Sequence, residues 1–536
     1  MKHLYSFLLS ALVCLSLSAQ NKVSGDSLAA DFHYLVKQLE AAHPDPYTGF
    51  GGKVFFHKQA FDLENELRSQ PHTLQEFWDK SMAFLSFIQD GHTYLFSLAP
   101  KQQQVQSYLP VGFRCIPDGL IVQSLPAAHQ DLLGSLLIGI NGKSMDELLA
   151  RTASLFACEN LYNRYSVFCR NVERKQFMQQ LLPDLEDTVC FYLRTPDGKD
   201  VALEQHFMEN EELRKAEKVS LPSWVGCPEE QMAYRFIDKK KEVMMFKVNS
   251  IMARDNFEYM YKHMKGDLLR QMEFYYQNSL KKEMPADTLQ AIRALPSFSG
   301  TFAAMLKEMK KHHSEYLIID LRGNSGGWTP IVLASLYQLY GDKYLQKDMD
   351  TEYYRIVSPL YMNKLEITLE EFNRRYGTDY SFGDYTFSMK EQEDVPLDTL
   401  RRQFIDGCMS SVKEELRAQK GAPVYAPKQV FVVTDERTFS AAFHYAFMLW
   451  KMRATVVGVP SGQAPNTFME QTLFKLPYTG IEGSISNSVQ IFLPGKDKRA
   501  KTFWPDVMLT YDEYKQTGFD KQAEILFLLN KIGQEK

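Results

Sequence analysis

The sequence lacks the features that mark several classes of protein. Beyond its N-terminal stretch it has no run of about eighteen apolar residues, so no membrane-spanning helix is expected. Acidic and basic residues are mixed throughout and leave a formal net charge of only −5, which argues against a nucleic-acid-binding protein. Internal repeats and low-complexity tracts are absent as well. What remains is a globular chain that, at 536 residues and 45% hydrophobic, can bury more than one core.

Cysteine is scarce and scattered. The chain has seven cysteines: Cys14, Cys115, Cys158, Cys169, Cys190, Cys227 and Cys408. They form no CxxC pair and no cysteine–histidine cluster. This pattern does not support zinc binding, and neither a metal ion nor another cofactor is expected. Widely spaced thiols in a long chain are typical of core residues rather than of a disulfide framework.

The N-terminus has the organisation of a cleaved signal peptide, which we assign to residues 1–19. A short basic region precedes an apolar stretch that ends at Leu17, and small residues follow. Cleavage fits after Ser18 or one residue later. Cys14 would suit a lipid anchor, but the bulky Val13 before it does not match the usual bacterial lipobox. We therefore expect an exported protein, either periplasmic or secreted.

Residues 20–100 are predicted to form an N-terminal helical domain. A first helix is indicated by apolar residues at helical spacing: Leu28, Phe32, Leu35, Val36 and Leu39. A second helix opens with the capping box formed by Thr73 and Glu76. It ends at Asp90-Gly91, which leaves His92 just beyond a helix end.

Residues 105–207 are predicted to form a small β-rich module. Short apolar runs separated by turn residues indicate its strands: 111–115, 120–123, 136–140, 188–195 and 201–207. Ser144 and Glu147 indicate a capped helix within it.

Residues 230–536 alternate strands with helices. Continuous apolar stretches predict buried strands at 243–248, 316–321, 430–434 and 454–457. This alternation indicates an α/β fold whose sheet is at least partly parallel. Residues 342–425 interrupt it with a stretch rich in tyrosine and charge, which we interpret as an inserted helical lid.

A serine stands at the mouth of one predicted helix. After the strand at 430–434 and a short loop, Ser440-Ala441-Ala442 opens that helix. Reactive groups of α/β sheets lie past the carboxyl ends of strands, and the unpaired first amides of a helix suit a developing oxyanion. Serine is also a frequent N-cap, and this pattern taken alone favours a cap over a nucleophile.

A glycine-rich turn follows another predicted strand. The segment DLRGNSGG at 320–327 holds three glycines in five residues, which allow positive φ or a close approach of the backbone to a ligand. It does not contain the phosphate-binding pattern GxxxxGK[ST]. Thr329 is expected to cap, and Pro330 to begin, a helix that runs to Tyr340.

The glycine-rich turn and the serine segment indicate a function more specifically together than either does alone. In sequence and order, LIIDLRGNSGG, VFVVTDERTFSAA and VVGVPSGQAPNTF resemble the serine peptidase family of the carboxyl-terminal processing proteases, the tricorn core and interphotoreceptor retinoid-binding protein. The segment LLGSLLIGINGKSMDELL resembles the PDZ-like domain of that family, and HPDPY at 43–47 and DGHT at 90–93 resemble its tricorn-like branch. The resemblance covers roughly 28–340 and 426–510 and implies a ClpP/crotonase-like αβ peptidase core.

The resemblance also implies roles for individual residues. Ser440 matches the nucleophile, and His92 matches the general base of the tricorn-like branch, a role that suits an imidazole titrating near neutrality. The amides of Gly326, Gly327 and Ala441 match the oxyanion hole. A second histidine, one helical turn after the nucleophile at position 444, competes for the role of base but is expected to pack or to be solvated there.

The chain also departs from the family pattern. The processing proteases use a lysine base in a segment like the one from Gly458 to Asn466, where this sequence has Gln463-Ala464-Pro465 and no lysine until Lys475, so a serine–lysine dyad is not expected. Phe443 replaces a common acidic residue, and Gly91 replaces a serine before the histidine. Glu470 and Asp497 are candidates to orient the histidine, and the third catalytic member stays unassigned.

The resemblance predicts an exported serine peptidase that acts on peptide or protein substrates, with no nucleic-acid partner. A β-module that positions the substrate, or serves only as a spacer, fits this function equally well. The alternative is a non-catalytic binding protein on the same fold, because the retinoid-binding relative shows that fold does not settle function.

Overall fold

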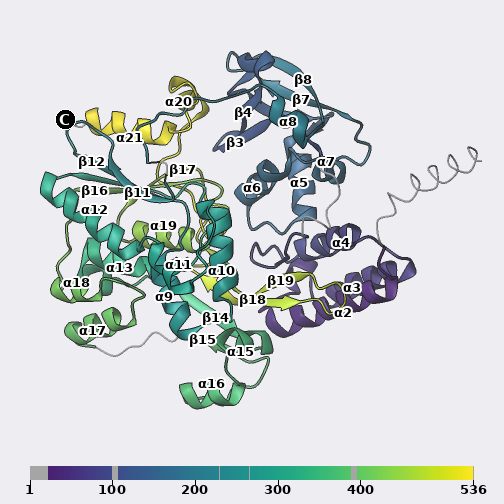
Figure 1. The fold of residues 1–536 in the computed structure, drawn as a ribbon. Coiled ribbons are helices and arrows are strands. Elements are labelled where there is room, and N and C mark those ends of the chain that lie inside the picture. The colour runs from purple at the N-terminus through teal and green to yellow at the C-terminus, as the bar shows by residue number, and fades with distance from the viewer. Residues whose placement is uncertain are drawn as a thin grey trace, which may run out of the picture.

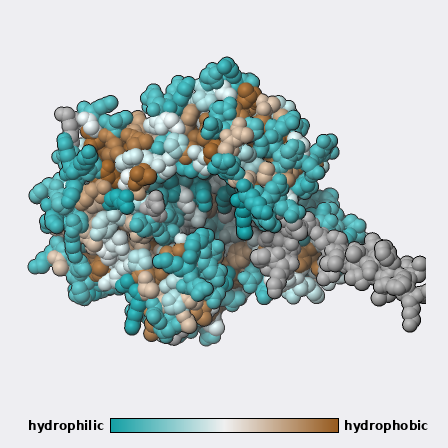
Figure 2. Space-filling model, turned by 45° about the horizontal axis from the view of Figure 1, so that its top comes forward, coloured by the Kyte–Doolittle hydropathy of each residue, from teal (hydrophilic) through white to brown (hydrophobic). Residues whose placement is uncertain are grey.

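The structure is a computed structural model that describes residues 22–98, 107–228, 230–264, 266–349, 351–387 and 395–534. The predicted signal peptide at 1–19, with Cys14, lies outside these residues. The six cysteines that the structure describes are free thiols. Within the same ranges no helix combines the length and apolarity needed to cross a membrane. Hydrophilic residues predominate on the face seen in Figure 2, with hydrophobic residues in small groups among them, as is usual for a face exposed to water.

A five-stranded sheet forms the centre of the C-terminal part. Its order is β11-β12-β13-β16-β17, and the last four strands are parallel whereas β11 is antiparallel to β12. The bounds are β11 Met232–Phe236, β12 Val243–Val248, β13 Tyr316–Asp320, β16 Gln429–Thr434 and β17 Thr455–Gly458. The structure therefore confirms the predicted α/β core and its four apolar strands.

Both faces of this sheet are covered, which explains why its strands are apolar throughout. Leu317 and Ile319 face a core shared with helices α12 (Phe298–His312), α13 (Pro330–Tyr340) and α19 (Ala441–Lys451). Tyr316 and Ile318 face the opposite core, which is shared with α20 (Tyr511–Gln516) and α21 (Ala523–Gln534). A helical segment precedes α12: α9 Arg254–His263, α10 Leu268–Phe274, the π-helix Tyr275–Leu280 and α11 Thr288–Ala294.

The N-terminal part is helical, as predicted. It comprises α2 Gly25–Ala42, the 3₁₀ turn Thr48–Phe50, α3 Lys53–Ser69, α4 Leu74–Ser86 and the two-residue strand β1 Tyr94–Leu95. The Thr73–Glu76 capping box is present at the start of α4. The helix ends at Ser86, four residues earlier than Asp90, so His92 follows a short loop rather than the helix itself.

The predicted β-rich module is present. Its antiparallel sheet has the order β10-β4-β5-β7-β8, with β3 beside β4 and β6 beside β5. The strands are β3 Gly112–Ile116, β4 Gly119–Pro126, β5 Leu136–Ile140, β6 Lys143–Ser144, β7 Thr188–Arg194, β8 Asp200–His206 and β10 Lys218–Ser220. A two-stranded ribbon, β2 Ser107–Tyr108 with β9 Met208–Glu209, and helices α5 Met145–Leu155, α6 Leu161–Asn171, α7 Lys175–Leu181 and α8 Asn210–Lys215 complete it. Its PDZ-like character stays a prediction.

The insert at 342–425 is not purely helical, so that part of the prediction is wrong. It contains helices α14 Asp342–Leu345, α15 Pro359–Leu365, α16 Leu369–Tyr376, α17 Leu397–Gly407 and α18 Lys413–Ala418, and also strands β14 Glu352–Ile356 and β15 Tyr385–Phe387. The β14 strand pairs with β19 (Glu482–Ile491), which lies far along the chain. Long-range pairing of this kind leaves no local signal in the sequence, and the role of the insert as a lid stays a prediction.

A second sheet joins parts that are distant in sequence. The long hairpin of β18 (Asn466–Lys475) and β19 reaches from the core to the N-terminal helices (Figure 1). There β19 pairs with β1 on one side and with β14 of the insert on the other. This hairpin fixes the N-terminal domain against the C-terminal core.

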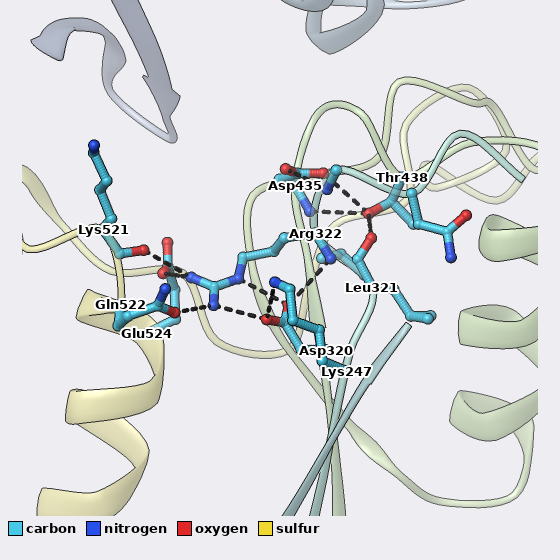
Figure 3. Close-up of polar contacts among 12 residues, drawn as sticks. Lys247, Asp320, Leu321, Arg322, Asp435, Thr438, Lys521, Gln522 and Glu524 are labelled. Carbon is cyan, nitrogen blue, oxygen red and sulfur yellow. Dashed lines mark hydrogen bonds and ion pairs between the residues drawn. The ribbon is translucent and has the colours of Figure 1, made fainter. Parts of the chain in front are cut away.

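A buried ion network lies at the carboxyl end of β13, just before the glycine turn (Figure 3). Arg322 extends from the strand end toward the start of α21, where its Nη1 donates to Glu524 Oε2 at 2.7 Å, while its Nε donates to Asp320 Oδ1 at 2.9 Å. Arg114 of the β-module donates to the other Glu524 oxygen at 2.8 Å. Burial opposes ionisation of Glu524, but the two arginines hold its pKa below the usual value of 4.5.

We expect Glu524→Ala to destabilise the protein by about 3–5 kcal/mol, because it leaves Arg114 and Arg322 buried without their shared partner. Urea unfolding at neutral pH would measure the loss. Since the folded-state pKa of Glu524 is lowered, this stabilisation is present above the usual carboxyl pKa and disappears as the pH falls through the acidic range.

The control is Glu371→Ala, which removes a carboxylate that is 42% exposed and 3.1 Å from Arg375. The free energy of unfolding of Glu371→Ala should stay within about 0.5 kcal/mol of the wild-type value. Equal losses for the two variants would contradict a special role for the buried network.

Candidate active site

Ser440 has a backbone conformation that is uncommon for any residue except glycine. It follows β16 and the loop 435–439 and immediately precedes α19, with φ of 52° and ψ of −128°. Its side chain makes no capping hydrogen bond to the helix. The interpretation of Ser440 as a simple N-cap is therefore wrong. Positive φ at a half-buried serine is a local strain of the kind found at functional sites.

The loop before Ser440 is fastened to the glycine turn. The Phe439 amide donates to Asn324 O at 3.0 Å, and the Gly323 amide donates to Asp435 Oδ2 at 2.8 Å. Figure 3 shows Thr438 beside Leu321, whose carbonyl accepts its hydroxyl at 3.1 Å. These contacts form because β13 and β16 are parallel neighbours, so the two loops leave the sheet at the same edge.

Two glycines of this turn lie so close to other parts of the chain that no side chain fits there. Gly326 has φ of +108°, and a Cβ there would lie 2.6 Å from the Ser440 Cβ. Gly327 has φ of +142°, and its Cβ would lie 2.2 Å from Ile251 O. Thr329 does not cap α13 as expected, because it adopts helical angles and its hydroxyl instead lies 2.8 Å from His444 Nδ1.

The three amides predicted to form an oxyanion hole differ in their hydrogen bonding. The Gly326 amide donates to Asn324 Oδ1 at 2.9 Å. Within the part of the chain that the structure describes, neither the Gly327 nor the Ala441 amide has a hydrogen-bond acceptor. These two amides remain available to a bound anionic group.

His92 is buried beside the residue that precedes Ser440. Its ring lies 4.9 Å, centroid to centroid, from the Phe439 ring. Its backbone amide donates to Asp90 Oδ1 at 2.9 Å, and its carbonyl accepts the Ser484 hydroxyl of β19 at 2.7 Å. The fold thus brings the predicted base from the N-terminal domain to the loop that carries the predicted nucleophile.

Two carboxylates face the imidazole, and no local pattern in the sequence predicted a role for either. His92 Nδ1 lies 3.8 Å from Asp90 Oδ1 and 3.9 Å from Glu159 Oε1. That nitrogen is buried and has no hydrogen-bond partner among the described residues. Glu159 comes from the β-module, between α5 and α6, where no local motif marks it.

Burial and charge set the pKa values of this group. Burial would raise the pKa of Asp90, but the hydrogen bond and charge of His43 and the charge of His92 lower it to about 2. Burial, together with the Asp90 charge, raises the pKa of Glu159 to about 8. Burial lowers the pKa of His92 below 6.5, although the Asp90 carboxylate and the backbone of Phe468 oppose that shift.

His43, from the HPDPY segment, lies beside the Asp90 carboxylate and does not face Ser440. It is buried, its Nδ1 accepts the Asp45 amide at 3.1 Å, and its Nε2 lies 3.4 Å from Asp90 Oδ2. Because Nδ1 accepts, Nε2 carries the proton and faces the carboxylate. The Thr93 hydroxyl donates to the same Asp90 oxygen at 2.5 Å.

Asp90, His92 and Glu159 are also the one group among the described residues that could hold a metal ion. Their donor atoms lie within 4.8 Å of one another. No metal site was predicted because the sequence holds no compact ligand motif, and these three residues come together only through folding. An ion held by His92 Nδ1 would compete with the proton that a general base must exchange.

Gln463 and His444 occupy the region beside Ser440. Gln463 Oε1 accepts the Ser440 amide, so a residue of the segment where the family lysine was sought holds the backbone of the predicted nucleophile. His444 is buried, with Nδ1 beside Thr329 Oγ1 and Nε2 2.6 Å from Gln490 Oε1. Burial lowers the pKa of His444 to about 4. A neutral imidazole with both nitrogens engaged is poorly suited to be the base.

Glu470 and Asp497, which were predicted as candidates to orient His92, form ion pairs with other residues. Glu470 in β18 lies 2.6 Å from Arg355 and 3.4 Å from Lys364, both in the insert, and accepts the Ser488 hydroxyl. Asp497 forms an ion pair with Arg499 at 2.7 Å. Glu470 therefore anchors the insert.

Two departures from the family pattern have packing explanations. Phe443 stands in α19 at a position where the family often has an acidic residue, and its side chain is fully buried in the core. A Cβ at Gly91 would lie 2.6 Å from the Phe439 ring, so this ring occupies the space that the family's serine would need. The same ring packs on His92 and shields it from water.

Comparisons with known proteins agree with this architecture. Residues 291–482 match the profile of Peptidase family S41, which confirms the resemblance noted in the sequence. No curated protein matches the sequence. Among solved structures, mature CPAF has a TM-score of 0.54 at 14% identity, over 95% of this chain and 98% of that chain. Mature CPAF complexed with lactacystin has a TM-score of 0.52 at 15% identity, over 94% and 97%. At such identity the likeness shows a shared fold.

We expect Gly326→Ala to reduce kcat on a small ester at least about 100-fold, because the new methyl group must displace Ser440 or Ala441. The matched control is Gly323→Ala, which also has a positive φ, of +76°, but has no atom within 4 Å of its added Cβ. It tests backbone strain alone and should retain activity within about tenfold. Similar losses in both variants would show that strain, rather than the approach to Ser440, is responsible.

Proposed function

We propose that this chain, which matches the model of peptidase family S41 over residues 291–482, is a serine-type peptidase that hydrolyses peptide bonds with Ser440 as the nucleophile and His92 as the general base. The observation that carries this proposal is the geometry around Ser440. An uncapped serine at positive φ lies against Gly326 and beside the two amides without acceptors, those of Gly327 and Ala441.

The proposed chemistry has two stages. His92 takes the proton of the Ser440 hydroxyl while the oxygen attacks the scissile carbonyl, and the amides of Gly327 and Ala441 stabilise the oxyanion. The imidazolium then gives that proton to the leaving amine, and an acyl-enzyme remains. Water attacks the ester with His92 again as base, which releases the carboxylic acid and restores Ser440. The Gly326 amide already serves Asn324, so we assign Gly326 the role of leaving space for Ser440.

The substrate class follows from this chemistry and from the surrounding parts. A peptide or protein chain is the proposed substrate, and the β-module and the insert are proposed to position it and to limit its access. Export to the periplasm or to the outside of the cell remains part of the proposal, since its signal lies outside the described residues.

We expect Ser440→Ala to abolish hydrolysis of a peptide or small ester, with a loss in kcat of about 10⁴–10⁶, while leaving the fold intact. Turnover would be followed with a chromogenic ester and folding by circular dichroism. A fluorophosphonate probe should label the wild type and not the variant. Wild-type-like turnover by Ser440→Ala would end the assignment of the nucleophile.

We expect His92→Ala to cause a comparable loss, whereas His444→Gln, which can keep hydrogen bonds to Thr329 and Gln490, should stay within about tenfold of wild type. Only neutral imidazole accepts a proton, so activity must fall as the pH drops through the pKa of His92. Because burial lowers that pKa below 6.5, the acid limb of kcat/KM should lie below pH 6.5. An inactive His444→Gln beside an active His92→Ala would reassign the base.

A further inference from the structure

Glu159 belongs to the β-module but lies at the active site. Its segment follows α5 and precedes α6, whose side chains pack in the core of the module. The neighbouring Asn160 fastens this segment to the C-terminal part: its side-chain amide donates to Ser461 O at 3.1 Å and to Lys501 O at 3.2 Å. The module is therefore docked at the place where Glu159 enters the site.

The Glu159 carboxylate joins the two halves of the proposed catalytic pair. Its Oε1 accepts the amide of Gly91, the residue before His92, at 3.3 Å. Its Oε2 accepts the Ala464 amide at 2.8 Å, and Ala464 follows Gln463, which holds the Ser440 amide. One side chain thus connects the base segment with the segment that fixes the nucleophile.

The imidazole presents an unsatisfied atom to this carboxylate. The His92 side chain is 8% exposed, and its Nδ1 lies 3.9 Å from Glu159 Oε1 without a hydrogen-bond partner among the described residues. A buried polar atom without a partner is costly, and a proton on Nδ1 would face both carboxylates. Asp90 Oδ1 lies at a similar distance, 3.8 Å, and Asp90 also accepts the His92 amide and the Thr93 hydroxyl. Glu159 differs from Asp90 because it also accepts the Ala464 amide, next to the residue that holds Ser440.

We infer that Glu159 is the positioning residue of the catalytic pair, so that the β-module supplies the missing third member of the site. The inference rests on the proposed roles of Ser440 and His92. It also changes the expected role of the module, which completes the active site as well as receiving substrate.

The physical role of Glu159 has a geometric and an electrostatic part. By accepting the Gly91 and Ala464 amides it keeps His92 at a fixed place relative to Ser440. When His92 carries the proton taken from Ser440, a carboxylate beside Nδ1 favours that imidazolium. The other titratable groups near the ring are Asp90 on its own loop, His43 after α2 and His444 on α19.

The test compares Glu159→Gln with one matched control. Glutamine keeps the size of the side chain but can accept only one of the two amides, and it carries no charge. We expect kcat on a small ester to fall about 10–100-fold with KM unchanged within about twofold. The control is Glu470→Gln, which removes a buried carboxylate that serves the insert. It should keep kcat within about threefold of wild type.

A conservative variant separates positioning from mere structure. Glu159→Asp keeps the charge but cannot span both amides, so its kcat on the small ester should fall while KM stays within about twofold of wild type. A merely structural role would instead lower the resistance of both variants to urea and leave the kcat of the folded enzyme unchanged. Glu159→Asp also serves as the test should Glu159→Gln not fold.

Three results would overturn the inference. A Glu159→Gln enzyme with wild-type kcat would remove Glu159 from the site. An equal loss of kcat in Glu470→Gln would show that removing any buried carboxylate near the site has this effect. Loss of wild-type activity on treatment with EDTA and its return with Zn²⁺ would show that Asp90, His92 and Glu159 hold a metal ion instead. A wild-type protein that fluorophosphonate does not label would refute the proposed function itself, which keeps the two failures distinct.

Discussion

The arrangement of this protein depends on the buried guanidinium of Arg322. It stands at the point where β13 ends and the glycine turn begins, and it binds Asp320 of its own strand and Glu524 of the C-terminal helix. Through Glu524 it also reaches Arg114 of the β-module. A buried charge fixes the positions of its partners, because moving a partner away would leave the charge unpaired in a medium of low dielectric constant. The glycine turn therefore leaves the sheet in one direction, toward Ser440.

The residues of the proposed active site come from three parts of the chain that fold around this point. Ser440 and the glycine turn come from adjacent parallel strands, His92 from the end of the N-terminal domain and Glu159 from the β-module. The β18–β19 hairpin holds the first two parts together, since Ser484 binds the His92 carbonyl and Glu470 anchors the insert through Arg355 and Lys364. A site assembled in this way is sensitive to how the parts dock, because small shifts change the distance between base and nucleophile.

Local patterns predicted a large share of the fold and part of the site. The four apolar strands of the core sheet, the capping box at Thr73 and the position of Ser440 past a strand end all follow from short-range rules. The errors arose where tertiary contacts outweigh those rules. The Thr329 hydroxyl lies beside His444 Nδ1 instead of accepting an amide of its helix, and β14 of the insert forms because β19 provides an edge for it to pair with. No pattern within a few residues contains either partner.

The sequence by itself determined the α/β alternation, the glycines that permit a close approach to Ser440 and the family to which these motifs belong. These features depend on the conformational freedom and polarity of neighbouring residues, which are local properties. Only the tertiary structure decided that His92, rather than His444, has a nitrogen without a hydrogen-bond partner among the described residues. It also decided that Asp90 and Glu159 face this nitrogen, whereas Glu470 and Asp497 pair with other side chains. Burial and charge pairing depend on which distant segments meet, and spacing along the chain does not contain that information.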